Sequence, residues 1–470
     1  MDYVSTRGQA PVLDFEGVTL TGLASDGGLY LPESWPQFSQ REIAAMRGLP
    51  YPQLAAKIMA PFVEGSLSHD ELLALCEQAY GGFDHGAVTP LVQLDEQHWL
   101  LELFHGPTLA FKDVALQLLG LLFERFLARR DGPLTIIGAT SGDTGSAAIH
   151  AVAGRDNVEI FMLHPEGRVS EIQRRQMTTV SAANVHNFAI RGSFDDAQAM
   201  VKRMFADAAL TDRIDIGAVN SINWARLMAQ VVYYFYAALQ LGAPDRKIAF
   251  SVPTGNFGDV FAGYVAARMG LGVERLIVAT NKNDILARAI RDGDYSVGES
   301  HATITPSMDI QVSSNFERLL FEANGRNAAG LAEQMRGFGE KAALMLDPQQ
   351  REGIAALFSA SRADPEQTIE AMRWAHETCG EVIDPHTAVG LHAARAMATA
   401  DAIDPQVPVV TLATAHPAKF PDAVKQAIGS EAPLPARVGD LFALPERFEV
   451  LPGEYDAVRD YISAKATGAA

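Results

Sequence analysis

The stretch "FHGPTLAFKDVALQ", residues 104–117, places a lysine between a Gly-Pro-Thr turn and an apolar helical pattern. Lys112 is preceded by Leu109, Ala110 and Phe111, and apolar residues recur at helical spacing from Val114 onward. Such a lysine is either a solvated charge on the first turn of a helix or an amine held in an apolar pocket. The first alternative is the commoner one for a lysine taken alone. In the second, the desolvated amine loses its proton more easily and can form a Schiff base with a carbonyl group.

The composition is that of a globular protein with an acidic balance. The chain has 470 residues, of which 48% are hydrophobic and 20% are charged, and its formal net charge is −19 at pH 7. This length allows two or three domains with a large core. Because no long run of Lys and Arg offsets the acidic charge, neither nucleic acid nor an anionic membrane is expected as a partner. An anionic substrate would need a site that is locally positive.

Cysteine usage and the N-terminal residues favour a cytoplasmic protein. Cys76 and Cys379 lie far apart and form neither a CxxC motif nor a zinc-binding pattern. We therefore expect no disulfide framework and no metal site. The first residues, "MDYVSTRGQAPVLDFEGV", contain an early acid and no apolar stretch of the kind a signal peptide needs. The longest apolar run, residues 231–243, is too short to span a membrane and predicts a core helix.

The hydrophobic pattern changes near residue 90. Before it, a mostly helical N-terminal domain of residues 1–90 is predicted by helical patterns near 40–47, 51–62 and 69–79. After it, short buried runs predict strands at 134–140, 158–163, 247–253, 275–280 and 407–414. These runs alternate with predicted helices at 145–154, 171–180 and 260–270. The alternation indicates an α/β fold with open, mainly parallel sheets in a catalytic core of residues 91–430. Residues 325–380 are helix-rich, and residues 431–470 are expected to form a peripheral C-terminal tail.

Two of the predicted strand-to-helix loops have the composition of anion-binding turns. Ligands of open α/β sheets bind at the carboxyl ends of the strands, where such loops begin. The loop "GATSGDTGSAA", 138–148, offers small polar residues and free amides at a helix start, which suits a carboxylate; a well-capped turn is the equal alternative. The loop "SVPTGNFGDVFAG", 251–263, resembles neither a Walker loop nor GxGxxG, but its glycines would let backbone amides close around a phosphate. Asp259 in this loop is interpreted as a helix cap.

Two further segments add polar groups at helix starts. Thr414, at the end of a predicted strand, could hydrogen-bond a ring nitrogen, although an ordinary cap is the commoner role for such a hydroxyl. Asn220, Ser221 and Arg226 in "NSINWARLMAQ" bring amides, a hydroxyl and a guanidinium together, and Arg226 is either a ligand of phosphate or carboxylate or half of a surface ion pair. Three histidines could be acid–base groups or metal ligands, but no HxxxH or HExxH pattern supports a metal, so they are interpreted first as loop or turn residues: His105, His386 and His416.

Taken together, these segments resemble one family, the threonine synthases of the bacterial and fungal type, which belong to the fold-type II enzymes dependent on pyridoxal 5'-phosphate (PLP). The resemblance covers almost the whole chain, and the joint occurrence of the matching stretches in order is more specific than any single loop. The stretches are "STRG" (5–8), "DGGLY" (26–30), "FHGPTLAFKD" (104–113), "ATSGDTGSAA" (139–148), "NSINWAR" (220–226), "PTGNFGD" (253–259), "NKND" (281–284), "SMDIQVSSNFERLLF" (307–321), "DPHTAVG" (384–390) and "TAHPAKFP" (414–421).

The resemblance implies a fold like that of the tryptophan synthase β subunit and an activity, the last step of threonine biosynthesis. The family converts O-phospho-L-homoserine and water to L-threonine and phosphate, as monomers or homodimers. By this resemblance Lys112 holds PLP covalently, and Thr414 is the neutral partner of the pyridine nitrogen. The remaining implied ligands fall into three groups: Gly255, Asn256, Phe257 and Gly258 for the cofactor phosphate; Thr140, Ser141, Asp143 and Thr144 for the substrate carboxylate; and Asn220, Ser221 and Arg226 for the substrate phosphate.

One position departs from the wider fold-type II pattern. Many relatives have an asparagine beside the phenolic oxygen of the cofactor, where this chain has Asp143. The bacterial and fungal threonine synthases share the aspartate, which either faces the cofactor or caps the helix.

Three other functions are alternatives to a threonine synthase. A PLP-dependent lyase would release 2-oxobutanoate from the same substrate; a non-catalytic PLP-binding protein is disfavoured by the intact Lys112 and Arg226; and a nucleotide enzyme lacks its standard motifs.

Overall fold

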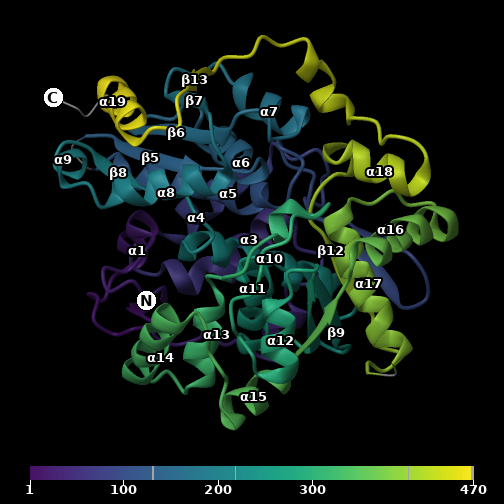
Figure 1. Cartoon of the computed structure of the whole chain (residues 1–470). Helices are drawn as coiled ribbons and strands as arrows, with labels where there is room; N and C mark the ends of the chain where they lie inside the picture. Colours follow the sequence, from purple (N-terminus) through teal and green to yellow (C-terminus); the bar gives the residue numbers. More distant parts are fainter. Residues whose placement is uncertain (130–131, 218, 401, 467–470) are drawn as a thin grey trace.

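The computed structural model describes residues 1–129, 132–217, 219–400 and 402–466. Two mainly parallel sheets with helices packed on their faces dominate the architecture (Figure 1), as the sequence predicts. We call them the β9 sheet and the β6 sheet. The β9 sheet has the order β11 (Phe358–Arg362), β10 (Val273–Thr280), β9 (Ile248–Pro253), β12 (Val409–Ala413), β4 (His98–Glu102) and β3 (Leu91–Gln93), and only the β3–β4 pair is antiparallel among these strands.

The β6 sheet is parallel throughout its described strands. Its order is β13 (Glu449–Leu451), β7 (Val185–Ile190), β6 (Val158–Pro165), β5 (Leu134–Ala139) and β8 (Asp215–Gly217). Every residue of β6 is buried, which is the expected pattern for a central strand with helices on both faces. Because both faces of β6 are covered, its sequence is a nearly continuous apolar run, which is why the strand is predicted from sequence.

The helices between residues 112 and 428 connect the strands of the two sheets and cover the faces of both. Those around the β6 sheet are α5 (Lys112–Leu127), α6 (Asp143–Val152), α7 (Glu171–Thr178), α8 (Phe194–Phe205) and α9 (Ala208–Thr211). Those that follow toward the β9 sheet are α10 (Trp224–Gln240), α11 (Gly258–Arg268), α12 (Ile285–Asp292), η1 (Pro306–Met308), α13 (Phe316–Ala323), α14 (Ala328–Lys341), α15 (Pro348–Ala355), α16 (Pro365–Trp374), η2 (Ala375–Cys379), α17 (Pro385–Thr399), η3 (Pro417–Lys419) and α18 (Pro421–Ile428). The apolar run at 231–243 forms the second half of the largely buried α10 and the three residues after it, which agrees with the predicted core helix. No helix of the described residues is long and apolar enough to cross a membrane.

The N-terminal residues form a helical layer that packs on α5 and α10. A short antiparallel pair joins β1 (Tyr3–Ser5) to β2 (Tyr30–Pro32), and the helices are α1 (Phe15–Thr21), α2 (Gln40–Ala44), α3 (Tyr51–Val63) and α4 (His69–Tyr80). The α3 and α4 bounds match the prediction closely, because Ser68 caps α4 in a reciprocal box with Glu71. The rings of Tyr3 and Phe62 pack on the ring of Trp224 in α10, with centroid-to-centroid distances of 5.9 and 5.6 Å.

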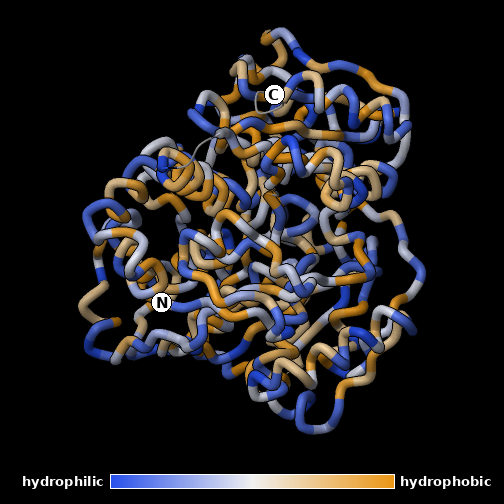
Figure 2. The backbone as a smooth tube through the Cα atoms, turned by 90° about the vertical axis from the view of Figure 1, so that its left-hand side faces the viewer, coloured by the Kyte–Doolittle hydropathy of each residue, from blue (hydrophilic) through white to orange (hydrophobic). Residues whose placement is uncertain are grey.

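The C-terminal segment returns from the β9 sheet to the β6 sheet. After α18 it passes through η4 (Ala436–Phe442), adds β13 to the edge of the β6 sheet, and ends in α19 (Tyr455–Lys465) (Figure 1). Val458 and Ile462 of α19 are fully buried against Phe188 and Ile190 of β7. The C-terminal segment, expected from sequence to be a peripheral tail, is therefore instead part of the β6 sheet and its core, because β13 pairs with β7 and α19 buries apolar side chains. Figure 2 shows the backbone from a second side, with hydrophobic and hydrophilic stretches alternating along most of the chain.

Candidate active site

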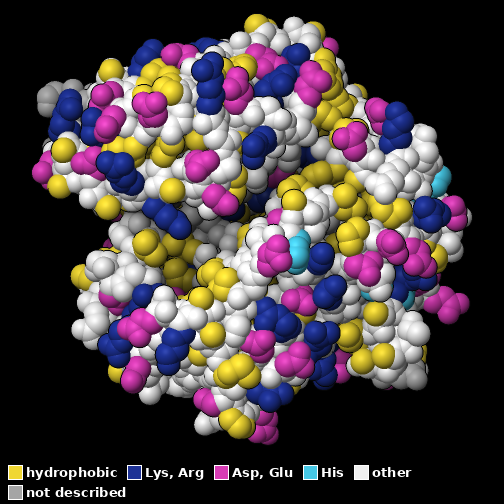
Figure 3. All heavy atoms as spheres, in the orientation of Figure 1, with side chains coloured by type: hydrophobic (Ala, Val, Ile, Leu, Met, Phe, Trp, Pro, Cys, Tyr) yellow, Lys and Arg dark blue, Asp and Glu magenta, His cyan; other side chains and the backbone are white. Residues whose placement is uncertain are grey.

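A cavity lies between the two sheets, where the carboxyl ends of β9 and β12 meet the starts of α5, α6 and α11. This is the place at which open α/β folds bind ligands, and Figure 3 shows the surface hollowed between the two parts of the molecule. Most of the residues singled out from sequence line it together: Lys112, Asp143, Thr144, Ser221, Arg226, Gly255, Asn256, Phe257, Gly258 and Thr414. Segments up to 300 residues apart in sequence thus share one site.

Lys112 is a buried amine and not a solvated surface charge, but its pocket holds charged groups as well as apolar ones. It is the first residue of α5, and its side chain is 11% exposed. Burial lowers the pKa of Lys112 from its ordinary value; the nearby carboxylate of Asp143 opposes this shift, whereas the cations Lys419 and Arg226 add to it. A lysine with a lowered pKa is more often neutral at physiological pH, which is the form that attacks a carbonyl carbon or accepts a proton.

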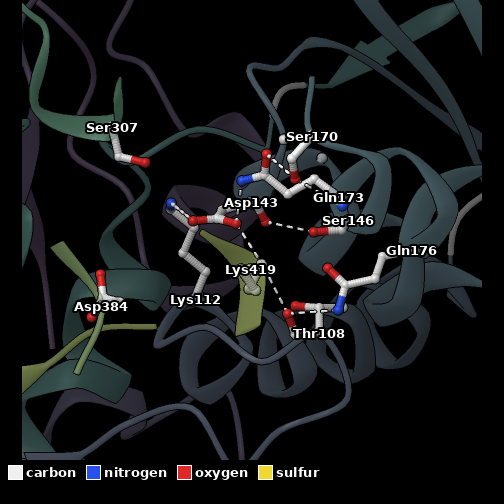
Figure 4. Close-up of polar contacts among 12 residues, drawn as sticks. Thr108, Lys112, Asp143, Ser146, Ser170, Gln173, Gln176, Ser307, Asp384 and Lys419 are labelled. Carbon is white, nitrogen blue, oxygen red and sulfur yellow. Dashed lines mark hydrogen bonds and ion pairs between the residues drawn. The ribbon is translucent and has the colours of Figure 1, made fainter. Parts of the chain in front are cut away.

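Asp143 begins α6 and faces two lysines. Its Oδ2 atom lies 3.7 Å from Nζ of Lys112, while Oδ1 lies 2.6 Å from Nζ of Lys419 and accepts a hydrogen bond of 2.9 Å from Nε2 of Gln173 (Figure 4). Burial by itself would raise the pKa of Asp143, but the ammonium groups of Lys419 and Lys112 outweigh it and hold the pKa well below its usual value. Asp143 is therefore an ionised carboxylate that reaches the cavity.

Residues 255–258 form a tight cradle at the start of α11. The backbone of Phe257 has a positive φ of 63°, and a Cβ atom added to Gly255 would lie 2.7 Å from the carbonyl oxygen of Ser307. Any side chain at position 255 would therefore collide with the neighbouring loop. The first amides of a helix have no intrahelical acceptor, and they carry the positive end of the helix dipole. Backbone amides at such a helix start are the donors with which proteins bind phosphate groups.

Arg226 is a buried guanidinium with free donors. It lies on the first turn of α10 and is 4% exposed, so the surface ion pair considered from sequence is not formed. Its Nε and Nη1 atoms have no hydrogen-bond partner within the described part of the chain. Burial lowers the pKa of Arg226 to about 10, which leaves the group charged at neutral pH. A buried cation without a partner is costly, and an anion bound in the cavity would satisfy it.

Three of the residues singled out from sequence do not line the cavity. The hydroxyl of Thr140 accepts hydrogen bonds from the amides of Gly142 and Gly145, both at 2.9 Å, and so shapes the loop from within. Ser141 belongs to the same loop, and Oδ1 of Asn220 accepts from the amide of Ile222 at 3.3 Å. Their contribution, as the structure has it, is to the shape of the two loops.

Two cavity residues, Asp259 and His386, have other interpretations in the sequence analysis, a helix cap and a loop or turn residue. Asp259, expected as a helix cap, instead accepts hydrogen bonds on Oδ1 from the hydroxyls of Tyr233 and Tyr234, and its Oδ2 has no partner among the described residues. His386 also lines the cavity, and its Nδ1 atom lies 3.0 Å from Oδ1 of the buried Asp384. Asp259 lies in the motif "PTGNFGD", and Asp384 and His386 lie in "DPHTAVG". Their place in these motifs is the sequence signal that indicates a position in the site.

The described residues contain no group of three or more His, Cys, Asp or Glu side chains that could hold a metal ion. The cavity combines a buried lysine with a lowered pKa, a glycine-containing loop at a helix start and a hydroxyl at the end of β12. Together with the two parallel sheets, this combination defines the protein as a fold-type II PLP-dependent enzyme.

Comparisons with known proteins narrow the class. Family models match along the chain: "Threonine synthase N terminus" over residues 2–80, "Pyridoxal-phosphate dependent enzyme" over 83–365 and "Threonine synthase, C-terminal" over 387–462. The threonine synthase of Pseudomonas aeruginosa is 54% identical over 464 residues, which cover 98% of each chain. The chain belongs to the threonine synthase family, and PLP is its cofactor.

Solved structures agree with this assignment over the full length. The crystal structure of PLP-bound threonine synthase from Brucella melitensis superposes with a TM-score of 0.96 at 51% identity, covering 99% of this chain and all of that one (100%). Threonine synthase from yeast superposes with a TM-score of 0.93 at 38% identity, covering 99% of this chain and 98% of that one. The fold class predicted from sequence is confirmed.

Proposed function

We propose that this enzyme converts O-phospho-L-homoserine and water to L-threonine and phosphate. The observation that carries the proposal is the buried guanidinium of Arg226, whose unpaired donors lie in the same cavity as Lys112. A planar guanidinium fork matches the geometry of a phosphate group and binds it through paired, charge-assisted hydrogen bonds. The cavity also holds a separate cradle at 255–258, so one site offers ligands for two phosphates: that of the cofactor and that of the substrate.

The residues present fit PLP. Lys112 would hold it covalently, the amides of the 255–258 cradle would bind its phosphate, and the hydroxyl of Thr414 would face its ring nitrogen. Thr414 lies at the carboxyl end of β12, and its backbone is fixed because its carbonyl accepts from the amide of Phe111 at 2.8 Å. When bound, PLP supplies an electron sink for negative charge formed on substrate carbon atoms. A neutral hydroxyl at the ring nitrogen, in place of a carboxylate, would limit how much charge the ring stores.

The protein side chains then supply binding and proton transfer. The amine of Lys112 is the base that removes protons from the substrate carbons and later returns one, since burial lowers its pKa. Arg226 and Ser221 bind the substrate phosphate. They stabilise the charge that builds on this group as its bond to the γ-carbon breaks. The oxygen of water ends on the β-carbon, so threonine and phosphate account for all atoms of the substrates. Asn220 would support this phosphate subsite.

The loop at the start of α6 would bind the substrate carboxylate. Thr144 lines the cavity, and the amides of the loop are held in place by the hydroxyl of Thr140. Ser141 lies in the same turn. Asp143 has a different environment: as an ionised carboxylate 3.7 Å from Lys112, it would repel a substrate carboxylate and attract the substrate amine. We therefore assign it to the lysine side of the cavity.

A product assay tests the proposal. Purified protein reconstituted with PLP is given O-phospho-L-homoserine, with Lys112→Ala as the matched variant, and threonine, phosphate and 2-oxobutanoate are quantified. Threonine and phosphate in equal amounts, absent in the variant, would support the proposal. Phosphate with 2-oxobutanoate in place of threonine would show the lyase reaction. Without any turnover, despite PLP bound through Lys112, the proposed substrate would be wrong.

We also propose a cytoplasmic enzyme of one or two subunits, with the domain division at residues 90 and 430. Cys76 and Cys379 are free thiols, which agrees with a reducing compartment. Light scattering coupled to size-exclusion chromatography measures the subunit number directly, since the monomer has a mass of 50.6 kDa. A tetramer or a larger assembly would contradict the proposal.

A further inference from the structure

Lys419 is a fully buried lysine to which the proposed reaction assigns no task. It ends the short turn η3 directly after β12, and its side chain has 0% exposure. Its Nζ atom lies 2.6 Å from Oδ1 of Asp143 and donates a hydrogen bond of 2.7 Å to the carbonyl oxygen of Thr108 (Figure 4). Removing an ammonium group from water is expensive, so these two contacts must offset a large cost. Such a group indicates a positional or electrostatic role.

The carboxylate of Asp143 is shared unequally between two lysines. Oδ1 is within hydrogen-bond distance of Lys419 and also accepts from Nε2 of Gln173 at 2.9 Å. Oδ2 stays 3.7 Å from Nζ of Lys112, which is longer than a hydrogen bond. Lys419 and Gln173 thus hold the carboxylate on one side, and Lys112 keeps only a looser attraction to it. An amine outside a tight ion pair loses its proton more easily.

The second contact of Lys419 fixes the turn that precedes Lys112. The carbonyl oxygen of Thr108 accepts from Lys419 and also from Nε2 of Gln176 at 3.0 Å. The amide and hydroxyl of Thr108 donate to the two oxygens of Asp113, at 2.8 and 2.7 Å, and Asp113 is the neighbour of Lys112 on α5. Lys419 therefore contacts both Asp143, which lies beside the amine of Lys112, and the turn that precedes Lys112.

We propose that Lys419 is a positioning residue for Lys112: its ammonium holds Asp143 away from Lys112 and fixes the turn at Thr108, which keeps the amine of Lys112 available for the cofactor. The inference rests on the proposal that Lys112 is the cofactor-bearing lysine. Three charged groups act on Lys112: Asp143 of α6, Arg226 of α10 and Lys419 of η3. Two other titratable side chains, Asp259 of α11 and His386 of α17, line the same cavity.

The test removes the charge of Lys419 in the holoenzyme. Lys419→Met abolishes both charge and hydrogen bonds, Lys419→Gln keeps a donor without the charge, and Lys419→Arg keeps the charge. The readout is the pH midpoint of the absorption change of the Lys112-bound cofactor, which a merely structural role would not move. Loss of the nearby cation leaves Asp143 to pair with Lys112, so we expect the midpoint to rise by about 1 pH unit or more in the Met and Gln variants. The Arg variant should keep the wild-type midpoint.

A second substitution isolates the carboxylate. Adding Asp143→Asn to either charge-removing variant should bring the midpoint back down, because the partner that captures Lys112 is then gone. An unchanged midpoint in a folded, cofactor-loaded Lys419→Met protein would overturn the proposal; if that variant does not fold, the Gln variant decides by the same criterion. Borohydride reduction followed by peptide mapping identifies the modified lysine. Cofactor found on a lysine other than Lys112 would overturn the Lys112 assignment itself, independently of the role of Lys419.

Discussion

Arg7 and Glu317, which lie 310 residues apart in the sequence, form a bidentate ion pair. Nε and Nη2 of Arg7 donate to Oε1 and Oε2 of Glu317 at 3.0 and 2.9 Å, and the hydroxyl of Thr6 donates to Oε1 at 2.7 Å. Glu317 lies on the first turn of α13, just after Asn315, whose side chain and amide both donate to the carbonyl oxygen of Asn256. The N-terminal layer is thereby tied to the helix that supports the phosphate cradle.

Glu317→Gln should lower the free energy of unfolding by about 2 kcal/mol, because a nearly buried charge-assisted pair loses one partner. Arg7 is 28% exposed, which keeps the cost below that of a fully buried pair. Denaturant unfolding at fixed PLP concentration measures the change. The matched control is Glu274→Gln, which breaks an exposed pair with Lys247 and should cost well under 1 kcal/mol. Equal effects of the two substitutions would contradict the prediction.

Asp259 should make the stability of the protein fall as pH rises. Burial raises the pKa of Asp259 to about 7 in the fold, well above its ordinary value of 3.8, although the hydroxyls of Tyr233 and Tyr234 partly offset the shift. Between these two values the unfolded chain releases the proton and the folded protein retains it, so stability decreases from about pH 4 to pH 7 and is then level for this group.

The measurement compares thermal midpoints of wild type and Asp259→Asn from pH 5 to pH 8. Asparagine keeps an acceptor for the two tyrosine hydroxyls and cannot ionise, so the variant should lose less stability over this interval than the wild type. The difference should be on the order of 2 to 3 kcal/mol, from about two pH units at roughly 1.4 kcal/mol each. Parallel curves for the two proteins would show that Asp259 does not titrate there. Asp284, which is partly buried and paired with Arg288 and Arg362, offers Asp284→Asn as the control.

Arg226→Gln should lower kcat/KM for O-phospho-L-homoserine by about 100- to 1000-fold, since a buried charge-assisted contact to the leaving phosphate is lost. The absorption spectrum of the bound cofactor should remain, because the 255–258 cradle is intact in this variant. Arg246→Gln is a suitable control. That exposed guanidinium donates to the carbonyl oxygen of Gln406 before the start of β9, whereas the cavity lies at the carboxyl end of that strand. Wild-type kcat/KM in Arg226→Gln would remove Arg226 from the substrate site.

The parts of the site that could be predicted from sequence are those encoded in one continuous segment. The turns at 138–148 and 255–258, Thr414 and Lys112 each carry a local signal, namely a strand end followed by small residues or an apolar helix. Lys419 and Gln173 carry none, because their roles exist only once η3 and α7 approach Asp143 in space. Strand β11 is not predicted for a related reason: it lies between α15 and α16, in a region whose pattern is helical, and only Phe358 and Ala360 of its residues are buried.

Gly142 should be far less tolerant of a side chain than Gly154, although both have positive φ, 138° and 71°. A Cβ atom at Gly142 would lie 2.5 Å from Cδ of Gln173, the residue that holds Asp143, whereas a Cβ at Gly154 would meet nothing within 4 Å. Gly154→Ala therefore carries only backbone strain of about 1 kcal/mol. Gly142→Ala combines a backbone conformation that side chains rarely adopt with displacement of the end of the Gln173 side chain, and we expect a loss of about 2 to 3 kcal/mol in unfolding free energy. Because the clash displaces Gln173, it should also free Asp143 to approach Lys112 and raise the pH midpoint of the cofactor absorption. Equal unfolding free energies for the two variants, with no shift in that midpoint, would show that the close approach of Gln173 is not needed to hold Asp143.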